Sequence, residues 1–476
     1  MIHNIQEFFN LLPLIIIGSG IVISVVVELY IKNSRTILPW FSVLLFFFTG
    51  VYSIFTVENT SVLMQNMIAT GGNVNIFYFL FNIGAALVCL LSIDYIKKYG
   101  TNYGEYYILL QTSVLGMMLM AGAKDLFTIF LGLELMSISF YVLAGINRRS
   151  FSATEAALKY FLLGAFATGF IVYGIALMYG SLGTTSIDSI IQNFDVLSSN
   201  ILFILGALLF LIGFSFKIAA FPFHMWVPDV YHGAPTTVAG IFSTGGKAAA
   251  FSAIIVTFFA LFTGTHQNIF TPYLSVIAVF SMLFGSVVAI VQTNIKRMLA
   301  YSSISHAGYI TIGLAAGNPD GVAGIIFYLA AYTFMNLGAF GIIALIEGKD
   351  ETNLEISSYS GLGNKYPVLA GALSIFMFSL AGIPPFAGFF GKYYVFISAI
   401  KADLTWLAIV GVISSVISVY FYLRIVVVMY FKSAEQPLFL EKSNTGLTAV
   451  MVSLLIVIVL GVLPGSFIDL VSEFLR

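Results

Sequence analysis

The stretch FLIGFSFKIAAFPFHMW, residues 210–226, places a lysine and a proline inside one long apolar segment. Proline removes a backbone hydrogen bond and breaks or kinks a helix. Broken helices at membrane depth are tolerated only around a wet or protein-lined cavity. The stretch SLAGIPPFAGFFGK, residues 379–392, repeats the arrangement with Pro384, Pro385 and Lys392. We therefore expect two interrupted membrane helices, each with a lysine beside its break.

The composition around these stretches is that of a membrane protein. Of 476 residues, 59% are hydrophobic and 9% are charged, with 20 Lys and Arg against 21 Asp and Glu. A soluble domain carries about 25% charged residues, and a nucleic-acid binder needs a basic face. The single cysteine, Cys89, excludes an internal disulfide and an all-cysteine iron–sulfur cluster. Gly246-Lys247 does not fit a phosphate loop, so we expect no redox or nucleotide cofactor in this chain. We also expect no metal site, because lysine is a poor ligand and no carboxylate cluster accompanies the buried lysines; a Na⁺ site on the Ser and Thr stripes is the alternative.

A spanning helix needs about 20 mainly apolar residues, and fourteen such stretches occur along the chain. They lie near 11–31, 37–57, 77–96, 107–122, 125–146, 156–180, 201–228, 235–262, 271–291, 300–316, 321–346, 366–400, 405–430 and 446–467. Alternating polar and apolar residues, typical of barrel strands, are absent. The sequence therefore predicts an all-α polytopic membrane protein with about 14 transmembrane helices.

Basic residues in the connections predict the orientation of these helices, because Lys and Arg gather on the cytoplasmic side. Connections after odd-numbered stretches carry Lys32, Arg35, Lys97, Lys98, Arg148, Arg149, Lys296, Arg297, Lys349, Lys365, Lys432 and Lys442, and the other side carries Lys124, Lys401 and Arg476. We expect the odd-numbered connections on the inner side of the membrane and both termini on the outer, periplasmic side.

The two predicted breaks suggest an internal repeat. Pro222 and Pro385 lie 163 residues apart, an interval of five predicted helices. Because five is odd, the two units have opposite orientation, which is typical of inverted-repeat transporters. The predicted parts are a three-helix segment (1–106), a first repeat (107–262), a second, inverted repeat (271–430) and a C-terminal helix (446–476).

Lys217 and Lys247 lie deep within the first predicted repeat. A charge at the bilayer centre costs about 2.5–3.5 kcal/mol on insertion scales, so its default interpretation is functional. Lys217 precedes Pro222, where a break admits water; the alternative is permanent pairing with an acid. Lys247 ends a stripe of small and polar residues predicted to share its helical face, namely Thr236, Gly240, Ser243 and Thr244. The alternative for Lys247 is a packing seam with one lysine reaching toward the interface.

Glu134 lies in the fifth stretch, with Ser137 and Tyr141 on its helical face. A lone buried carboxylate tends to be neutral, and a nearby lysine keeps it ionised. We interpret Glu134 as a proton-linked partner of Lys217, although a structural ion pair is an alternative and both can hold. Together with Lys247 and Lys392, these residues form a predicted proton path.

Three further residues are weaker candidates for supporting roles. Lys159 has Glu155 four residues earlier, so an ion pair at the inner boundary is an adequate alternative. His306 titrates near neutral pH in its ordinary state, which suits a relay, but a satisfied core histidine is nearly as good an interpretation. His224 could take part in proton uptake at the inner end of the seventh helix or cap a helix.

Four motifs in this sequence resemble the antiporter-like membrane subunits of respiratory complex I. They are LELMS (133–137), FPFHMWVPDVYHGAPTTV (221–238), AYSSISHAGY (300–309) and SLAGIPPFAGFFGK (379–392). The resemblance covers nearly the whole chain and implies fourteen helices with two inverted five-helix repeats and broken helices 7 and 12. It also implies a proton-translocating role for Glu134, Lys217, Lys247 and Lys392, with Lys159 as the sixth-helix lysine. Lys392 in place of a glutamate, and the short stretch after the last helix, favour the paralogue nearest the quinone module.

The resemblance implies a translocase subunit of a bacterial inner membrane. NADH, FMN, iron–sulfur clusters and quinone would then be bound by other subunits, and the partners would be the neighbouring membrane-arm subunits. The rival hypothesis is a subunit of a multi-subunit cation/proton antiporter, which shares this fold. A stand-alone transporter of an organic solute is disfavoured, because no polar or aromatic cluster accompanies the lysines at the breaks.

Overall fold

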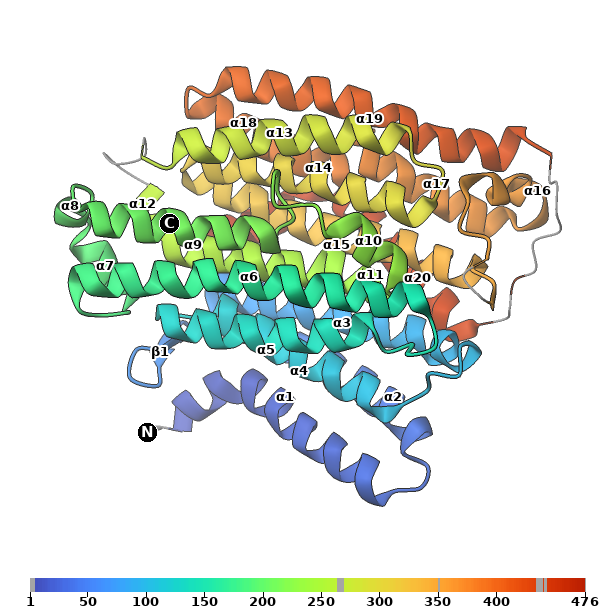
Figure 1. Cartoon of the computed structure of the whole chain (residues 1–476), viewed down its shortest axis with the longest axis horizontal. Helices are drawn as coiled ribbons and strands as arrows, with labels where there is room; N and C mark the ends of the chain where they lie inside the picture. Colours follow the sequence, from blue (N-terminus) through green and yellow to red (C-terminus); the bar gives the residue numbers. More distant parts are fainter. Residues whose placement is uncertain (1–4, 263–268, 350–351, 434–439, 441–442, 476) are drawn as a thin grey trace.

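The computed structural model describes residues 5–262, 269–349, 352–433, 440 and 443–475. In chain order the helices are α1 (Ile5–Tyr30), α2 (Ser34–Phe55), α3 (Gly72–Lys98), α4 (Gly104–Ala121), α5 (Leu126–Ala144), α6 (Phe151–Leu182), α7 (Ile187–Gln192), α8 (Phe194–Leu197), α9 (Ile201–Lys217), α10 (Val227–Gly233), α11 (Thr236–Ile241), the π-helical turn η1 (Phe242–Gly246), α12 (Lys247–Phe262), α13 (Thr271–Ile290), α14 (Ile295–Ala316), α15 (Pro319–Ile346), the 3-10 turn η3 (Ile356–Tyr359), α16 (Leu362–Lys365), α17 (Pro367–Ala381), α18 (Ala387–Lys401), α19 (Thr405–Phe431), α20 (Asn444–Val462) and α21 (Pro464–Glu473). The long helices lie side by side in one bundle, with α1 at one edge and α18 and α19 at the opposite edge (Figure 1).

The predicted helical membrane class is confirmed. Within the described part of the chain, ten helices are long and apolar enough to cross a membrane, and α9 and α17 are shorter apolar helices. Lipid cannot satisfy open backbone groups, so apolar stretches of this length form helices whose hydrogen bonds are internal. The total of fourteen spans, and the bounds of the two repeats, stay predictions.

Both Pro-containing stretches interrupt their helices. In the first, α9 ends at Lys217 and α10 begins at Val227; in the second, α17 ends at Ala381 and α18 begins at Ala387. The last carbonyl groups of a helix lack hydrogen-bond donors within the helix. At both breaks, side chains donate to these carbonyl groups. Trp226 Nε1 donates to the Phe216 carbonyl oxygen at 3.1 Å, and Lys392 serves the end of α17 in the same way.

Three local features depart from the predicted pattern of uninterrupted helices. Strands β1 (Ser61–Leu63) and β2 (Ile68–Thr70) form an antiparallel hairpin between α2 and α3. The π-helical turn η1 interrupts the eighth stretch. The last predicted stretch, 446–467, ends as a helix at Val462, because Pro464 cannot continue it and instead begins α21.

Helices approach closely where glycines face each other. A Cβ on Gly116 would lie 2.5 Å from the Gly132 carbonyl oxygen, and one on Gly174 would lie 2.6 Å from the Gly206 carbonyl oxygen. These pairs join α4 to α5 and α6 to α9. Small residues allow such contacts in membrane bundles, where van der Waals packing rather than the hydrophobic effect associates helices.

One basic residue assigned to a connection is buried instead. Lys296 lies in the first turn of α14 with 1% of its surface exposed, and its Nζ donates to the Ala234 carbonyl oxygen at 2.8 Å. The end of α14 is covered by the junction of α10 and α11, which the sequence pattern does not reveal. Lys442 and Arg476, also used to predict orientation, lie outside the described residues.

Candidate functional site

Lys217 is buried at the end of α9, against α5. Its Nζ donates hydrogen bonds to the hydroxyls of Ser137 at 2.9 Å and Tyr141 at 3.2 Å. The same atom lies 5.6 Å from the centre of the Tyr141 ring. The ammonium group of Lys217 is therefore bound by two neutral hydroxyls, which lie on the face of α5 that was predicted to carry Glu134.

Glu134 is turned toward α6 and not toward the ammonium group of Lys217. Its Oε1 accepts a hydrogen bond from the Thr168 hydroxyl at 2.8 Å. Among the residues that the structure describes, no ion pair joins Glu134 to Lys217, although the carboxylate is near enough for its charge to act on the lysine. A permanently closed ion pair is therefore wrong, because Thr168 and the α5 hydroxyls take the two charged groups separately.

Lys247 is the first residue of α12, directly after the π-helical turn, and 1% of its surface is exposed. Its Nζ donates to the carbonyl oxygen of Ser303 at 2.5 Å and to the Ser303 hydroxyl at 2.6 Å. These contacts with α14 exclude a lysine that reaches out to the membrane interface. The π-helical turn, which shifts the helical register locally, includes Ser243 and Thr244 of the predicted stripe.

His306 lies buried on α14, near enough to Lys247 and Lys392 for both charges to act on it. Its Nδ1 lies 2.8 Å from the Tyr328 hydroxyl and its Nε2 lies 3.0 Å from the Tyr422 hydroxyl. Tyr422 in turn bonds to the hydroxyl of Ser302, the neighbour of Ser303. The charges of Lys247 and Lys392 both act on the imidazole. Both ring nitrogens are thus hydrogen-bonded, as in a satisfied core histidine, and the relay role of His306 stays a prediction.

Lys392 lies in the first turns of α18 and reaches back across the break to α17. Its Nζ donates to the Ala381 carbonyl oxygen at 2.8 Å, to the Leu380 carbonyl oxygen at 3.2 Å and to the Ser415 hydroxyl at 2.8 Å. The same atom lies 4.7 Å from the centre of the Tyr309 ring. A positive group at the C-terminus of a helix is favourable, because the free carbonyl groups there carry partial negative charge.

A cluster of ion pairs lies apart from this buried row. Lys159 pairs with Glu155 at 2.7 Å, as predicted, and also with Asp229 at 2.7 Å. Arg297 pairs with the other oxygen of Asp229 at 2.8 Å. Because 40% of the Lys159 side chain is exposed, this lysine belongs to a half-exposed network that ties α6, α10 and α14 together.

This cluster predicts an acid-sensitive tie between α10 and its neighbours. Partial burial raises the pKa of Asp229, but hydrogen bonds from Lys159 and Arg297 outweigh burial and hold it below its usual value. Such a carboxyl stabilises the folded state above its unfolded pKa, and this contribution is lost as the pH falls through the lower, folded pKa. We expect Asp229→Asn to flatten the acid side of the thermal-stability profile, measured by melting the purified protein across acidic pH.

Asp320→Asn is the matched control for this prediction, since it removes another ion pair, that with Lys401 at 2.6 Å, between side chains more than half exposed. It should leave the acid limb of the profile as in the parent protein. Identical acid limbs for Asp229→Asn and the parent would contradict the assignment.

His224 and Arg424 do not join the hydrogen-bonded row. The His224 ring is buried beside the rings of Phe221 and Phe284, at 5.4 and 4.6 Å. Its Nδ1 has no hydrogen-bond partner in the described part of the chain, so it caps no helix through that atom, and its role in proton uptake stays a prediction. Arg424 donates to the carbonyl oxygens of Ile290 and Gln292 at the end of α13.

Comparison with known proteins identifies the family. Residues 123–418 match the sequence family described as "NADH:quinone oxidoreductase/Mrp antiporter, TM". The chain belongs to this family. The predicted resemblance to antiporter-like subunits of complex I is confirmed, and the buried lysines lie within the matched residues.

Relatives within the family match the chain from end to end. A NADH-quinone oxidoreductase subunit N from Trichlorobacter lovleyi is 43% identical over 99% of this chain and 98% of its own. A NADH-quinone oxidoreductase subunit N 1 from Chloroherpeton thalassium is 42% identical over 98% of both chains.

Solved structures show the same fold. A chain of respiratory complex I from Thermus thermophilus superposes with a TM-score of 0.84 at 30% identity, covering 97% of this chain and 99% of that one. A chain of the Mrp complex from Dietzia sp. DQ12-45-1b has a TM-score of 0.84 at 20% identity, covering 99% and 96%. At that identity, the second likeness concerns the fold alone.

This family member also contains polar groups that the sequence analysis missed. Tyr328 and Tyr422 complete the contacts of His306, and their hydroxyls give no distinctive signal in a sequence so rich in tyrosine. Ser303 lies near His306 in the sequence, but its contact with Lys247 was missed. Glu347, directly after α15, is buried and was also missed. The sequence could have marked it as a candidate, because it is a charged residue at the end of a long apolar stretch. Among the described residues, no group of three or more His, Cys, Asp or Glu side chains is placed to hold a metal ion.

Proposed function

We propose that this chain is the subunit N of a bacterial NADH:quinone oxidoreductase and that it translocates protons through its buried lysines. Its full-length relatives carry that name. The observation that carries the proposal is the placement of His306, whose ring nitrogens contact two tyrosines while the charges of Lys247 and Lys392 both act on the ring. Such a link gives a proton a route between two otherwise separate lysines.

In the proposed mechanism, Glu134 and Lys217 alternate between contact and separation. The structure corresponds to the separated arrangement, with Glu134 on Thr168 and Lys217 on two neutral hydroxyls. Loss of the carboxylate removes the partner that favours the charged form of the lysine. The proton of Lys217 then moves toward Lys247.

The second half of the route runs through α14. Ser303 receives Lys247, and the neighbouring Ser302 contacts Tyr422, which contacts His306. Tyr328, on the other nitrogen of His306, packs against Gly391, the neighbour of Lys392. Lys392 then releases its proton to the outer side of the membrane. Pro222, Pro384 and Pro385 interrupt the two broken helices beside Lys217 and Lys392.

The rest of the assembly follows from this proposal. Quinone reduction by electrons from NADH, carried through FMN and iron–sulfur clusters in other subunits, supplies the driving energy, and this chain holds no redox centre. Its partners are a neighbouring antiporter-like subunit and the small subunits on the quinone side. It crosses the cell inner membrane repeatedly, with both termini outside.

Co-purification tests the proposal against the antiporter alternative. We expect an affinity-tagged chain, extracted from its own membranes, to bring down flavin, iron–sulfur clusters and NADH:quinone activity that is absent from an untagged control. Recovery with antiporter subunits alone, without flavin or NADH oxidation, would contradict the proposal and favour cation/proton exchange.

A further inference from the structure

Glu347 is a buried carboxylate that the lysine row does not use. It follows α15 directly, and 1% of its surface is exposed. Its Oε2 accepts hydrogen bonds from the Tyr95 hydroxyl at 2.9 Å and from the Thr236 hydroxyl at 2.6 Å. A carboxylate is rarely buried without a specific reason, since its desolvation is costly.

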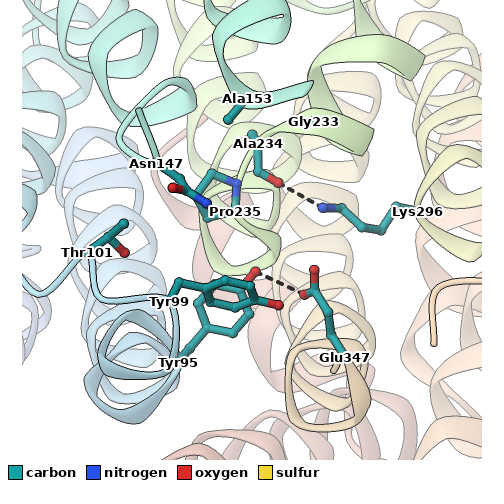
Figure 2. A pocket seen from close by; sticks show the side chains of 10 residues that line it. All are labelled: Tyr95, Tyr99, Thr101, Asn147, Ala153, Gly233, Ala234, Pro235, Lys296 and Glu347. Carbon is teal, nitrogen blue, oxygen red and sulfur yellow. Dashed lines mark hydrogen bonds between the residues drawn. The ribbon is translucent and has the colours of Figure 1, made fainter. Parts of the chain in front are cut away.

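The carboxylate lines a small cavity together with Tyr95, Tyr99 and Lys296 (Figure 2). The cavity measures about 20 Å³, which is room for about one water molecule. Tyr95 and Tyr99 come from the end of α3, Asn147 follows α5, and Lys296 begins α14, so the cavity lies where several predicted inner connections meet. Exposed Arg148 and Arg149 lie beside Asn147 in the same connection.

A row of polar contacts leads from this cavity to Lys247 between two antiparallel segments. The first contact joins Thr236 of α11 to Glu347, and the second joins Ser243 of η1 to Asn336 of α15 at 2.6 Å. At the third, Lys247 Nζ lies 5.8 Å from the centre of the Tyr332 ring.

The second contact also links to the third. Asn336 donates to the Tyr332 hydroxyl at 3.2 Å. Its Oδ1, in a side chain with 1% exposure, has no hydrogen-bond partner among the described residues. An unfilled buried acceptor in a polar row is a place for a bridging water molecule. These contacts join Ser243 to Lys247. Between Thr236 and Ser243, about 10 Å of helix, the proposed row depends on bridging water molecules.

We propose that Glu347 takes up protons from the inner side of the membrane and reloads Lys247 through this row. The carboxylate accepts a proton from a water molecule in the cavity. That water molecule then takes a proton from the bulk solvent in its turn. The carboxylic acid then passes a proton by way of the hydroxyls and bridging water to the neutral amine of Lys247 and returns to carboxylate. This step rests on the proposed function, since it refills Lys247 after its proton has moved toward Lys392.

Several titratable groups surround Glu347, and a substitution of Glu347 leaves them unchanged. In the described part of the chain they include Tyr95 and Lys98 of α3, Tyr99 directly after it, Lys296 of α14 and Tyr359 of η3. Lys98 donates to the Glu347 carbonyl oxygen and Lys296 to that of Ala234, so neither bond depends on the state of the carboxyl group.

Glu347→Gln in the assembled complex tests the uptake step. Glutamine keeps an acceptor for Tyr95 and Thr236 but cannot carry the proton. A positioned proton-transfer group contributes about 10²- to 10⁴-fold to its step, so we expect coupled turnover and pumping in membrane vesicles to fall at least about tenfold. Glu347→Asp should restore a large part of the loss, and the exposed Glu355→Gln should behave as the parent complex.

The outcomes separate this step from the proposed function. Full pumping by Glu347→Gln, beside lost pumping in a Lys247→Met complex, would overturn the uptake site and leave the lysine path standing. Full pumping by Lys247→Met would instead overturn the proposed function. If Glu347→Gln does not assemble, Thr236→Val keeps the carboxylate and removes the first hydroxyl of the row; unchanged pumping by that variant would also overturn the uptake route.

Discussion

Replacing Lys247 by methionine is expected to abolish proton pumping through this chain while leaving the fold intact. Methionine has a similar length and removes a buried charge whose insertion costs about 2.5–3.5 kcal/mol, so the helix gains no packing defect. The Ser303 carbonyl oxygen and hydroxyl lose their shared donor. The proton route then has no amine between Lys217 and His306.

The size of this effect follows from the chemistry of proton transfer. A positioned acid–base group accelerates its step by about 10²- to 10⁴-fold, so the coupled turnover of an assembled complex should fall by roughly 100-fold or more. Vesicles that report NADH oxidation and lumen acidification together measure it. Lys401→Met is the control, because Lys401 is more than half exposed and pairs with Asp320 away from the path.

Gly388→Ala is expected to prevent correct folding of the second break. A Cβ at Gly388 would lie 1.9 Å from the Ser379 carbonyl oxygen and 2.7 Å from the Ser379 carbonyl carbon. These are backbone atoms of α17, so no side-chain rotation relieves the contact. Overpacking costs about 1–3 kcal/mol where neighbours can adjust, and we expect at least that here, together with loss of the Gly388 N–H bond to the Ser379 hydroxyl at 3.0 Å.

Gly371→Ala provides the matched control on α17, the helix whose backbone Gly388 contacts. Nothing lies within 4 Å of a Cβ at that position, and alanine favours a helix by about 1 kcal/mol over glycine. The yield and melting temperature of the assembled complex should therefore fall for Gly388→Ala and hold or rise for Gly371→Ala. Equal stability of the two variants would show that the α17–α18 contact is looser than described.

The membrane helices and their breaks follow from local sequence, for a physical reason. Lipid forces each apolar stretch to satisfy its own backbone, so a run of about 20 apolar residues already specifies a helix. Proline and glycine then mark the interruptions beside Lys217 and Lys392. The cost of burying charge singled out Lys247 and Glu134, because each lies inside a long apolar stretch of the sequence.

The partners of these charges depend on contacts between segments far apart in the chain. Nothing near Lys247 indicates that Ser303, 56 residues away, receives its ammonium group. The face shared by Glu134, Ser137 and Tyr141 was visible in the sequence. The preference of Lys217 for the hydroxyls depends on Thr168 of α6, which holds the carboxylate.

The π-helical turn and the cavity of Glu347 were missed for related reasons. A π turn differs from an α-helix by one residue, and the two glycines of FSTGG weaken a helix without specifying a π turn. Glu347 and Lys296 lie at the ends of predicted stretches, where charges are ordinarily solvated. The chain buries both because the ends of α3, α11, α14 and α15 meet there.

The most direct test is the number of protons pumped per NADH oxidised by the purified, assembled complex in proteoliposomes, compared between the parent and Lys247→Met. The lysine path predicts that the variant either oxidises NADH with fewer protons pumped per electron pair or loses coupled turnover altogether. Unchanged turnover with an unchanged proton ratio would contradict the path through Lys247.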